Sequence, residues 1–234
     1  MEISNPLISC ICITNDRPHL LQQAINCFEL QTYQNKELLI SYPNNDGLTK
    51  ELIDHHKAEG KLNIIAVERD AEITLGNARN DALYNCNGAY ICIWDDDDWH
   101  HRDRLSIQFS SMNAIGQNYQ ASILTHIFLY DYTTHLGYLS FPHHWEGTLF
   151  CKKEMLLQNQ YADRNKAEDT HVVPFLERSK LLAHIDEAPY LYIYTFHGKN
   201  TWPYAHFEYF LNRSFLLNIE YIEDIRNKLG DTEY

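Results

Sequence analysis

Short apolar runs alternate with longer amphipathic stretches through the first hundred residues, and this alternation constrains the fold more than any other feature. Residues 7–14 are almost continuously apolar, as is typical of a central strand buried on both faces. Pro18 then stands where the first turn of a helix tolerates proline, and apolar residues repeat at helical spacing from Leu20 to Phe28. Consecutive strand-helix-strand units predict an α/β fold, with a mostly parallel mixed sheet flanked by helices.

The same periodicities predict the further elements of the chain. Strands are expected over residues 38–42, 62–67 and 89–94, and helices over about 49–60, capped by Thr49, and about 76–86. The second half is less regular. Its strand-like runs are 121–130, 136–141, 148–151, 181–185 and 190–195, and residues 203–221 form an aromatic-rich stretch that predicts a helix.

A chain of 234 residues with 44% hydrophobic content has enough apolar material for one good core but is short for two independent domains. We therefore expect a single domain over residues 1–234. Within it, residues 1–105 would form one half, residues 106–202 a second half, and residues 203–234 a C-terminal helical segment.

The net charge of -13 excludes non-specific binding to nucleic acid, because a polyanion would be repelled at long range. None of the six cysteines forms a CxxC pair, which predicts buried free thiols in a reducing compartment. Residues 1–6 contain no basic region followed by an apolar core, and no apolar run approaches the ~18 residues of a membrane span. We expect a cytoplasmic protein without a transmembrane segment; peripheral association with the inner face of a membrane, and a homo-oligomer, remain open.

Four adjacent aspartates, Asp95 to Asp98, directly follow the apolar strand at 89–94. Four like charges repel one another, and a hard cation such as Mg²⁺ or Mn²⁺ shared with substrate phosphates would neutralise them. The alternative is a solvated acidic turn. Because ligands bind at the carboxyl ends of strands in open α/β sheets, the loops after residues 13, 42 and 94 should converge on one cleft. Arg79, near the start of a predicted helix, is placed to receive anionic oxygens there, or else pairs with an exposed acid.

Four segments resemble the nucleotide-binding half of glycosyltransferase family 2 in their order and spacing, over roughly the first 105 residues. They are residues 6–18, Gln31-Thr32-Tyr33 before Lys36-Glu37-Leu38, Gly76-Asn77-Ala78-Arg79-Asn80, and Asp95 to Asp98. The resemblance implies a GT-A fold and inverting transfer of a sugar from a nucleotide diphosphate donor to an acceptor hydroxyl. It implies a divalent metal, Mn²⁺ or Mg²⁺, on Asp97. It also implies a donor site that includes Thr14, Asn15, Arg17, Arg79, Asp95 and Asp96.

One departure from the family concerns the base of the nucleotide. Family members commonly carry Asp-Asp-Gly-Ser after the second strand, and the first of those aspartates reads the base. This chain has residues 41–47, Ser-Tyr-Pro-Asn-Asn-Asp-Gly, instead. Either Asp46 has shifted into this role or an asparagine or backbone group takes it. We expect a uracil base, and hence a UDP-sugar.

The second half resembles the family more loosely. Trp145, Glu146 and Gly147 resemble the acceptor-side segment, which predicts a glycan or lipid-linked acceptor. Glu168 and Asp169 resemble the family's Glu-Asp pair, which implies Asp169 as the catalytic base and Glu168 as an acceptor-binding residue. Their position at the start of a predicted helix, 170–178, offers helix-dipole stabilisation as the alternative explanation.

The loop that begins at His197 resembles the C-terminal loop that closes over the donor. His197 would then be a further metal ligand and Lys199 a diphosphate partner. Alternatively His197 is one more of 13 histidines, and adjacent pairs such as His143-His144 lack the spacing of a zinc site.

Two rival functions remain. A sugar nucleotidyltransferase also uses an α/β sheet and a carboxylate-bound metal, but residues 14–18 contain none of the glycines that its phosphate loop requires. A non-catalytic nucleotide-sugar binding module would keep the aspartate run and lose the base. By analogy with the family, we expect an enzyme of cell-surface polysaccharide or glycan synthesis.

Overall fold

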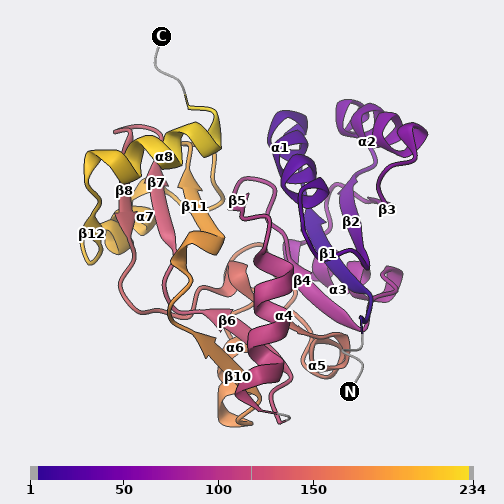
Figure 1. The fold of residues 1–234 in the computed structure, drawn as a ribbon. Coiled ribbons are helices and arrows are strands. Elements are labelled where there is room, and N and C mark those ends of the chain that lie inside the picture. Colours follow the sequence, from indigo (N-terminus) through magenta and orange to yellow (C-terminus); the bar gives the residue numbers. More distant parts are fainter. Residues whose placement is uncertain (1–4, 117, 232–234) are drawn as a thin grey trace.

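The strands of this computed structural model, which describes residues 5–116 and 118–231, form two sheets (Figure 1). In spatial order the larger sheet contains β10 (Leu182–Ile185), β6 (Ala121–Leu124), β9 (Phe150–Lys152), β4 (Tyr90–Ile93), β1 (Ile8–Ile13), β2 (Lys36–Pro43) and β3 (Ile64–Arg69). The smaller sheet contains β12 (Phe215–Leu216), β8 (Leu136–Leu139), β7 (Phe128–Asp131), β11 (Tyr192–Phe196) and β5 (Trp99–His100).

The larger sheet is mixed and mostly parallel, as the alternation of apolar runs predicts. β1 pairs in parallel with both β2 and β4, β2 with β3, and β6 with β10. Only β9 runs antiparallel to its neighbours, β4 and β6, among the described strands of this sheet. The carboxyl ends of β1, β2, β3 and β4 therefore lie at one edge, where the polar loops meet.

Helices cover both faces of the larger sheet (Figure 1). One face packs against α1 (Pro18–Glu29), α2 (Gly47–Glu59) and α4 (Arg104–Ile115). The other packs against α3 (Leu75–Asn85), α5 (Lys153–Gln158) and α6 (Val172–Arg178). In β1, Cys10 and Cys12 pack on the first face and Ile11 packs on the second. Because both faces of β1 are covered by helices, every residue of this strand must be apolar or small, which explains its unbroken apolar run. All six cysteines are buried and unpaired, which confirms them as buried free thiols.

The smaller sheet lies between two C-terminal helices, α7 (Tyr204–Leu211) and α8 (Ile219–Leu229). Leu129 of β7 packs in one cluster with Phe207 of α7, and the next residue, Tyr130, packs in another with Ile225 of α8. Neighbouring strand residues point to opposite faces, so β7 needs cover on both. Figure 1 shows α8 lying across β8, β7 and β11.

Several predicted boundaries are wrong, and long-range pairing explains most of them. Residues 121–130 form β6 and β7, which belong to different sheets, and residues 203–221 contain α7, β12 and the start of α8 instead of one helix. The α2 helix is capped by Asp46, whose Oδ1 accepts a hydrogen bond from the backbone N of Thr49 at 3.0 Å, so Thr49 is not the cap.

The remaining described helices are short 3₁₀ turns, η1 (Glu146–Thr148) and η2 (Pro189–Leu191). Strands β6, β9 and β10 come from the second half of the chain, so the expected division at residue 105 does not separate the two sheets. None of the helices in the described ranges is both long enough and apolar enough to cross a membrane.

Candidate active site

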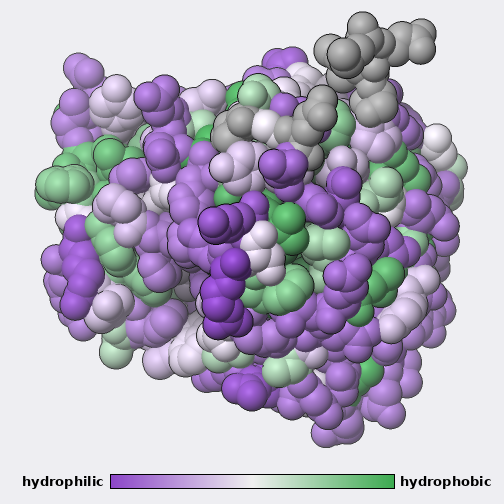
Figure 2. Space-filling model, turned by 90° about the horizontal axis from the view of Figure 1, so that it is seen from below, coloured by the Kyte–Doolittle hydropathy of each residue, from purple (hydrophilic) through white to green (hydrophobic). Residues whose placement is uncertain are grey.

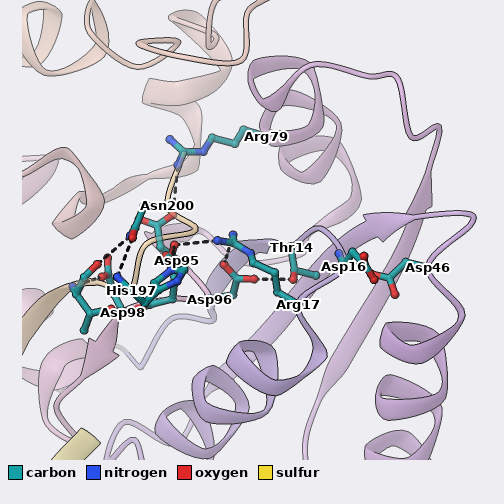
Figure 3. Close-up of polar contacts among 12 residues, drawn as sticks. Thr14, Asp16, Arg17, Asp46, Arg79, Asp95, Asp96, Asp98, His197 and Asn200 are labelled. Atoms are coloured by element: carbon teal, nitrogen blue, oxygen red, sulfur yellow. Dashed lines mark hydrogen bonds and ion pairs between the residues drawn. The ribbon is translucent and has the colours of Figure 1, made fainter. Parts of the chain in front are cut away.

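A cavity of ≈ 600 Å³ lies where the carboxyl ends of β1 and β4 face β11 and α7. Its lining includes the whole aspartate run and segments far apart in the sequence, among them Arg17, Arg79, Glu146, Asp169 and Tyr192. The loops after β1 and β4 converge on this cavity as predicted, but no residue of the loop after β2 lines it. The four aspartates do not share one environment, because each has its own partners. Figure 3 labels Asp95, Asp96 and Asp98.

Asp96 is the most deeply buried member of the run, with 1% of its surface exposed. It accepts hydrogen bonds from Thr14 Oγ1 at 2.6 Å and from Arg17 Nη2 at 2.6 Å. Burial and the neighbouring Asp97 raise the pKa of Asp96, while Arg17 and Thr14 oppose that rise. Thr14 thus supports the site through Asp96, and Arg17 connects the loop after β1 to the aspartate run.

Asp97 faces Arg17 and His197. Its Oδ2 lies 2.9 Å from Arg17 Nη1 and 3.4 Å from His197 Nε2. Burial opposes its ionisation, but the contact with His197 and the charge of Arg17 together lower the pKa of Asp97. Two ligand atoms on one divalent ion, each about 2.1 Å from it at right angles, are roughly 3 Å apart. The carboxylate oxygen of Asp97 and the imidazole nitrogen of His197 therefore fit a shared metal ion.

Asp98 has a structural role instead. It accepts a hydrogen bond from the Tyr192 hydroxyl and another from the backbone N of Thr195, 2.9 Å from Asp98 Oδ1. Both partners belong to β11, so Asp98 ties the loop after β4 to the smaller sheet. A Cβ on Gly147 would lie 2.7 Å from the Tyr192 hydroxyl and 2.9 Å from Asp95 Oδ2, so only glycine permits the approach of this turn.

Arg79 joins the aspartate run to the Glu168-Asp169 pair. Its guanidinium lies 3.3 Å from Asp95 Oδ1, 2.9 Å from Glu168 Oε1 and 3.6 Å from Asp169 Oδ2. Burial disfavours the charge, but Asp95 and Glu168 raise the pKa of Arg79 above its usual value. The partner Glu168 has only 5% of its side chain exposed, so Arg79 does not merely pair with an exposed acid. A Cβ on Gly76 would lie 1.8 Å from the Ala162 carbonyl oxygen, which shows how closely α3 approaches this segment.

Glu168 and Asp169 precede α6, since that helix begins at Val172 after the N-cap residue His171. The predicted helix over 170–178 therefore starts two residues too early, and the acids do not lie in its first turn. Burial raises the pKa of Glu168. Asp169 keeps 25% of its side chain exposed and lines the cavity, so it is the acid of the pair with room for a ligand.

The turn with Trp145, Glu146 and Gly147 lines the same cavity and rests on buried polar groups. Arg104 is fully buried and donates a hydrogen bond to the Gly147 carbonyl oxygen at 3.1 Å. It also lies 2.5 Å from His100 Nδ1, while His100 Nε2 lies 3.0 Å from the carbonyl oxygen of Asp95. Arg104 thus fixes the Trp145 to Gly147 turn relative to the aspartate run.

Besides Thr14, which acts through Asp96, three predicted donor residues do not line the cavity. Both carboxylate oxygens of Asp46 are occupied, Oδ1 by α2 and Oδ2 by the backbone N of Asp16 at 2.8 Å, and Figure 3 shows Asp46 apart from the aspartate run. Asn15 and Lys199 are exposed. Roles for these residues in donor binding stay predictions.

Sequence reasoning missed two kinds of site residue. Arg69, the last residue of β3, donates a hydrogen bond to the Thr14 carbonyl oxygen at 2.8 Å. Ligands bind at the carboxyl ends of strands, so the position of Arg69 could have been identified from the sequence. Tyr192 carries no sequence signal, because its role depends on a strand of the second sheet.

Glu146 leads to a prediction on the pH dependence of stability. Burial raises the pKa of Glu146 from 4.5 to about 7, so the folded state retains a proton that the unfolded state has lost. The contribution of Glu146 to the stability of the folded state is fully present below pH 4.5 and is lost as the pH rises to about 7. As the pH rises between these values, the free energy of unfolding of Glu146→Gln should come to exceed that of the wild type by up to ~3 kcal/mol. Urea unfolding of both proteins from pH 4 to pH 8 measures this, and parallel curves would contradict it.

Comparison with known proteins places this geometry in context. A family model described as Glycosyl transferase family 2 matches residues 9–176. The uncharacterized glycosyltransferase MJ1057 of Methanocaldococcus jannaschii is 30% identical over 113 residues, which are 47% of this chain and 39% of that protein. The chain thus spans about two fifths of that relative.

Solved structures share the fold at low identity. S. aureus TarS in complex with UDP-GlcNAc is 14% identical, with a TM-score of 0.68 over 82% of this chain and 59% of its own. Mannosyltransferase PcManGT from Pyrobaculum calidifontis, in complex with GDP-Man and Mn²⁺, is 13% identical, with a TM-score of 0.64 over 87% of this chain and 60% of its own. Two structures of glucosyl-3-phosphoglycerate synthase from Mycobacterium tuberculosis, with Mn²⁺ and UDP, are 12% and 13% identical, each with a TM-score of 0.58 over 87% of this chain and 74–75% of their own. These neighbours confirm the expected GT-A fold.

Proposed function

This chain belongs to glycosyltransferase family 2, and from that premise we propose that it transfers a sugar, with inversion, from a UDP-sugar to an acceptor hydroxyl. The observation that carries the proposal is the position of Asp169. A cavity-lining carboxylate with room for a ligand lies across Arg79 from Asp95, so an acid and the donor-binding aspartates share one cavity.

We place the donor against the loop after β1 and the aspartate run. Arg17 holds Asp96 and Asp97 in place, and Asp95 lines the cavity where a ribose or sugar hydroxyl would bind. In the neighbouring structures TarS binds UDP-GlcNAc and PcManGT binds GDP-Man, so both bases occur on this fold. We propose uracil from the resemblance of the chain to the family, with the departure at residues 41–47.

Asp97 and His197 would hold a divalent metal, Mn²⁺ or Mg²⁺, because their ligand atoms lie 3.4 Å apart. Such an ion, when bound, neutralises charge on the diphosphate leaving group. Both neighbours from Pyrobaculum calidifontis and Mycobacterium tuberculosis were solved with Mn²⁺.

The acceptor would enter between Asp169 on one side and the turn formed by Trp145 to Gly147 on the other. Asp169 removes the proton from the acceptor hydroxyl, and the hydroxyl oxygen attacks the anomeric carbon opposite the diphosphate. Arg79 contacts Glu168 and Asp169 together, which orients the base. The acceptor we propose is a glycan or a lipid-linked glycan of the cell surface.

The rival functions differ from this proposal in particular residues. A sugar nucleotidyltransferase would require glycines in the loop after β1, and residues 14–18 contain none. A binding module would have no use for an acid facing the donor aspartates, whereas Asp169 lines their cavity.

Asp97→Ala tests the donor and metal site. We expect it to abolish Mn²⁺-dependent binding of UDP while the protein stays folded, because the change removes an acid from a cluster of like charges. Calorimetric titration of UDP with and without Mn²⁺ measures the effect, and Asp54→Ala, an exposed acid on α2, is the matched control. An unchanged affinity for UDP and Mn²⁺ would remove Asp97 from the metal site.

A further inference from the structure

A second group of metal-ligating side chains lies outside the candidate active site. His144 precedes η1, Glu177 belongs to α6, and His184 belongs to β10. His184 Nε2 lies 3.0 Å from Glu177 Oε1, and His144 Nε2 lies 3.8 Å from the same oxygen. All three ligand atoms lie within 4.8 Å of one another. We propose that these residues bind a zinc ion.

The spacing of the ligand atoms matches tetrahedral zinc. At bond lengths of 2.0–2.2 Å, neighbouring ligands on such an ion are roughly 3.4 Å apart. The two distances to Glu177 Oε1, 3.0 and 3.8 Å, fall on either side of that value. Small rotations of partly exposed side chains are enough to bring the three atoms to equal distances from one ion.

Glu177 is within ion-pair distance of both histidines, but it can accept a hydrogen bond from only one of them. His184 is within hydrogen-bonding distance of Glu177, whereas 3.8 Å is too long for a hydrogen bond from His144. The His144 and His184 rings nevertheless lie with centroids 4.9 Å apart and direct their Nε2 atoms at the same carboxylate oxygen. Imidazole nitrogens are the commonest metal ligands in proteins.

The chemistry of the ligands selects the ion. Two imidazoles and one carboxylate suit zinc, while Mg²⁺ and Mn²⁺ prefer sites made of oxygen ligands. The ligands are each about one third exposed, which leaves a fourth position to water. The groove beside them is lined by polar residues, including His126, His143 and Asp186. α6 and β10 lie at the lower end in Figure 1, and Figure 2, seen from below, shows hydrophilic residues around a smaller group of apolar ones on this face.

A zinc ion here would connect segments that line the cavity of the active site. His144 directly precedes the Trp145 to Gly147 turn, and α6, which carries Glu177, follows Asp169 closely in the chain. Joining the two segments restrains the acceptor side of the cavity from outside. Zinc should therefore raise the melting temperature of the protein, because an ion that binds only the folded state stabilises it.

Calorimetric titration of the untagged protein with Zn²⁺ tests the proposal. We expect the wild type to bind one zinc ion per chain at this site. The zinc affinity should fall in each of three variants, His144→Ala, His184→Ala and Glu177→Gln. The fall should exceed the ~10-fold that the loss of an outer-shell partner costs. Glu177→Gln preserves the shape of the side chain, so the test does not depend on a truncated variant folding well.

His55→Ala is the matched control, because His55 pairs with Glu59 at 3.7 Å on the surface of α2. It should leave zinc affinity and the zinc-induced rise in melting temperature unchanged. Zinc bound at Asp97 and His197 instead would survive all three test variants. Either that result or the absence of zinc binding by the wild type overturns the proposal.

Discussion

Asp169→Asn is expected to lower turnover by ~10²- to 10⁴-fold, which is the usual worth of a general base. The amide occupies the same volume but cannot accept the acceptor's proton. Donor affinity should change little, because the contacts of Asp169 are with Arg79 and the acceptor side of the cavity. Initial rates with a UDP-sugar and an identified acceptor, together with calorimetric binding of UDP, separate the two effects.

Asp163→Asn is the control for this experiment. Asp163 is an exposed acid of the same segment, contacted by Thr74 Oγ1 at 2.7 Å, and it does not line the cavity. Its replacement should leave turnover unchanged. If Asp169→Asn retains full transfer with an inverted product, another acid is the base, even though the fold assignment stands.

Arg79→Met should destabilise the protein by about 3–5 kcal/mol, the usual cost of removing one partner from a buried ion pair. Arg79 is 8% exposed and is the cation in direct contact with Asp95, Glu168 and Asp169. Without it, the buried Glu168 carboxylate faces two further acids and must take up a proton or repel them. Urea unfolding at pH 7 measures the loss.

Adding Glu168→Gln to Arg79→Met tests the cause. If the uncompensated charge of Glu168 causes the destabilisation by Arg79→Met, Glu168→Gln should restore part of the stability. The two residues are coupled through their contact at 2.9 Å. Equal and additive losses from the two changes would show instead that packing of Arg79 against Tyr161, 5.3 Å from the ring centre, is what matters.

The first half of the fold followed from local pattern. Residues 7–14 predicted a strand buried on both faces, and β1 packs Cys10 and Ile11 against opposite layers of helices. Such elements can be predicted from the sequence because the spacing of apolar residues indicates which faces of a strand or helix are buried. The second half was harder, because residues 121–130 cross from one sheet to the other and no local period records that change.

For the site, the sequence by itself determined that Asp95 to Asp98 end a buried strand and lie where other strand ends converge, since chain connectivity places them there. Only the tertiary structure decided which partner each acid takes. Asp98 pairs with Tyr192 of β11, and Arg79 meets Glu168 some ninety residues later. Buried charges require partners, and these partners come from segments that only folding brings together. His144, Glu177 and His184 meet for the same reason, across three segments with no local spacing to reveal them.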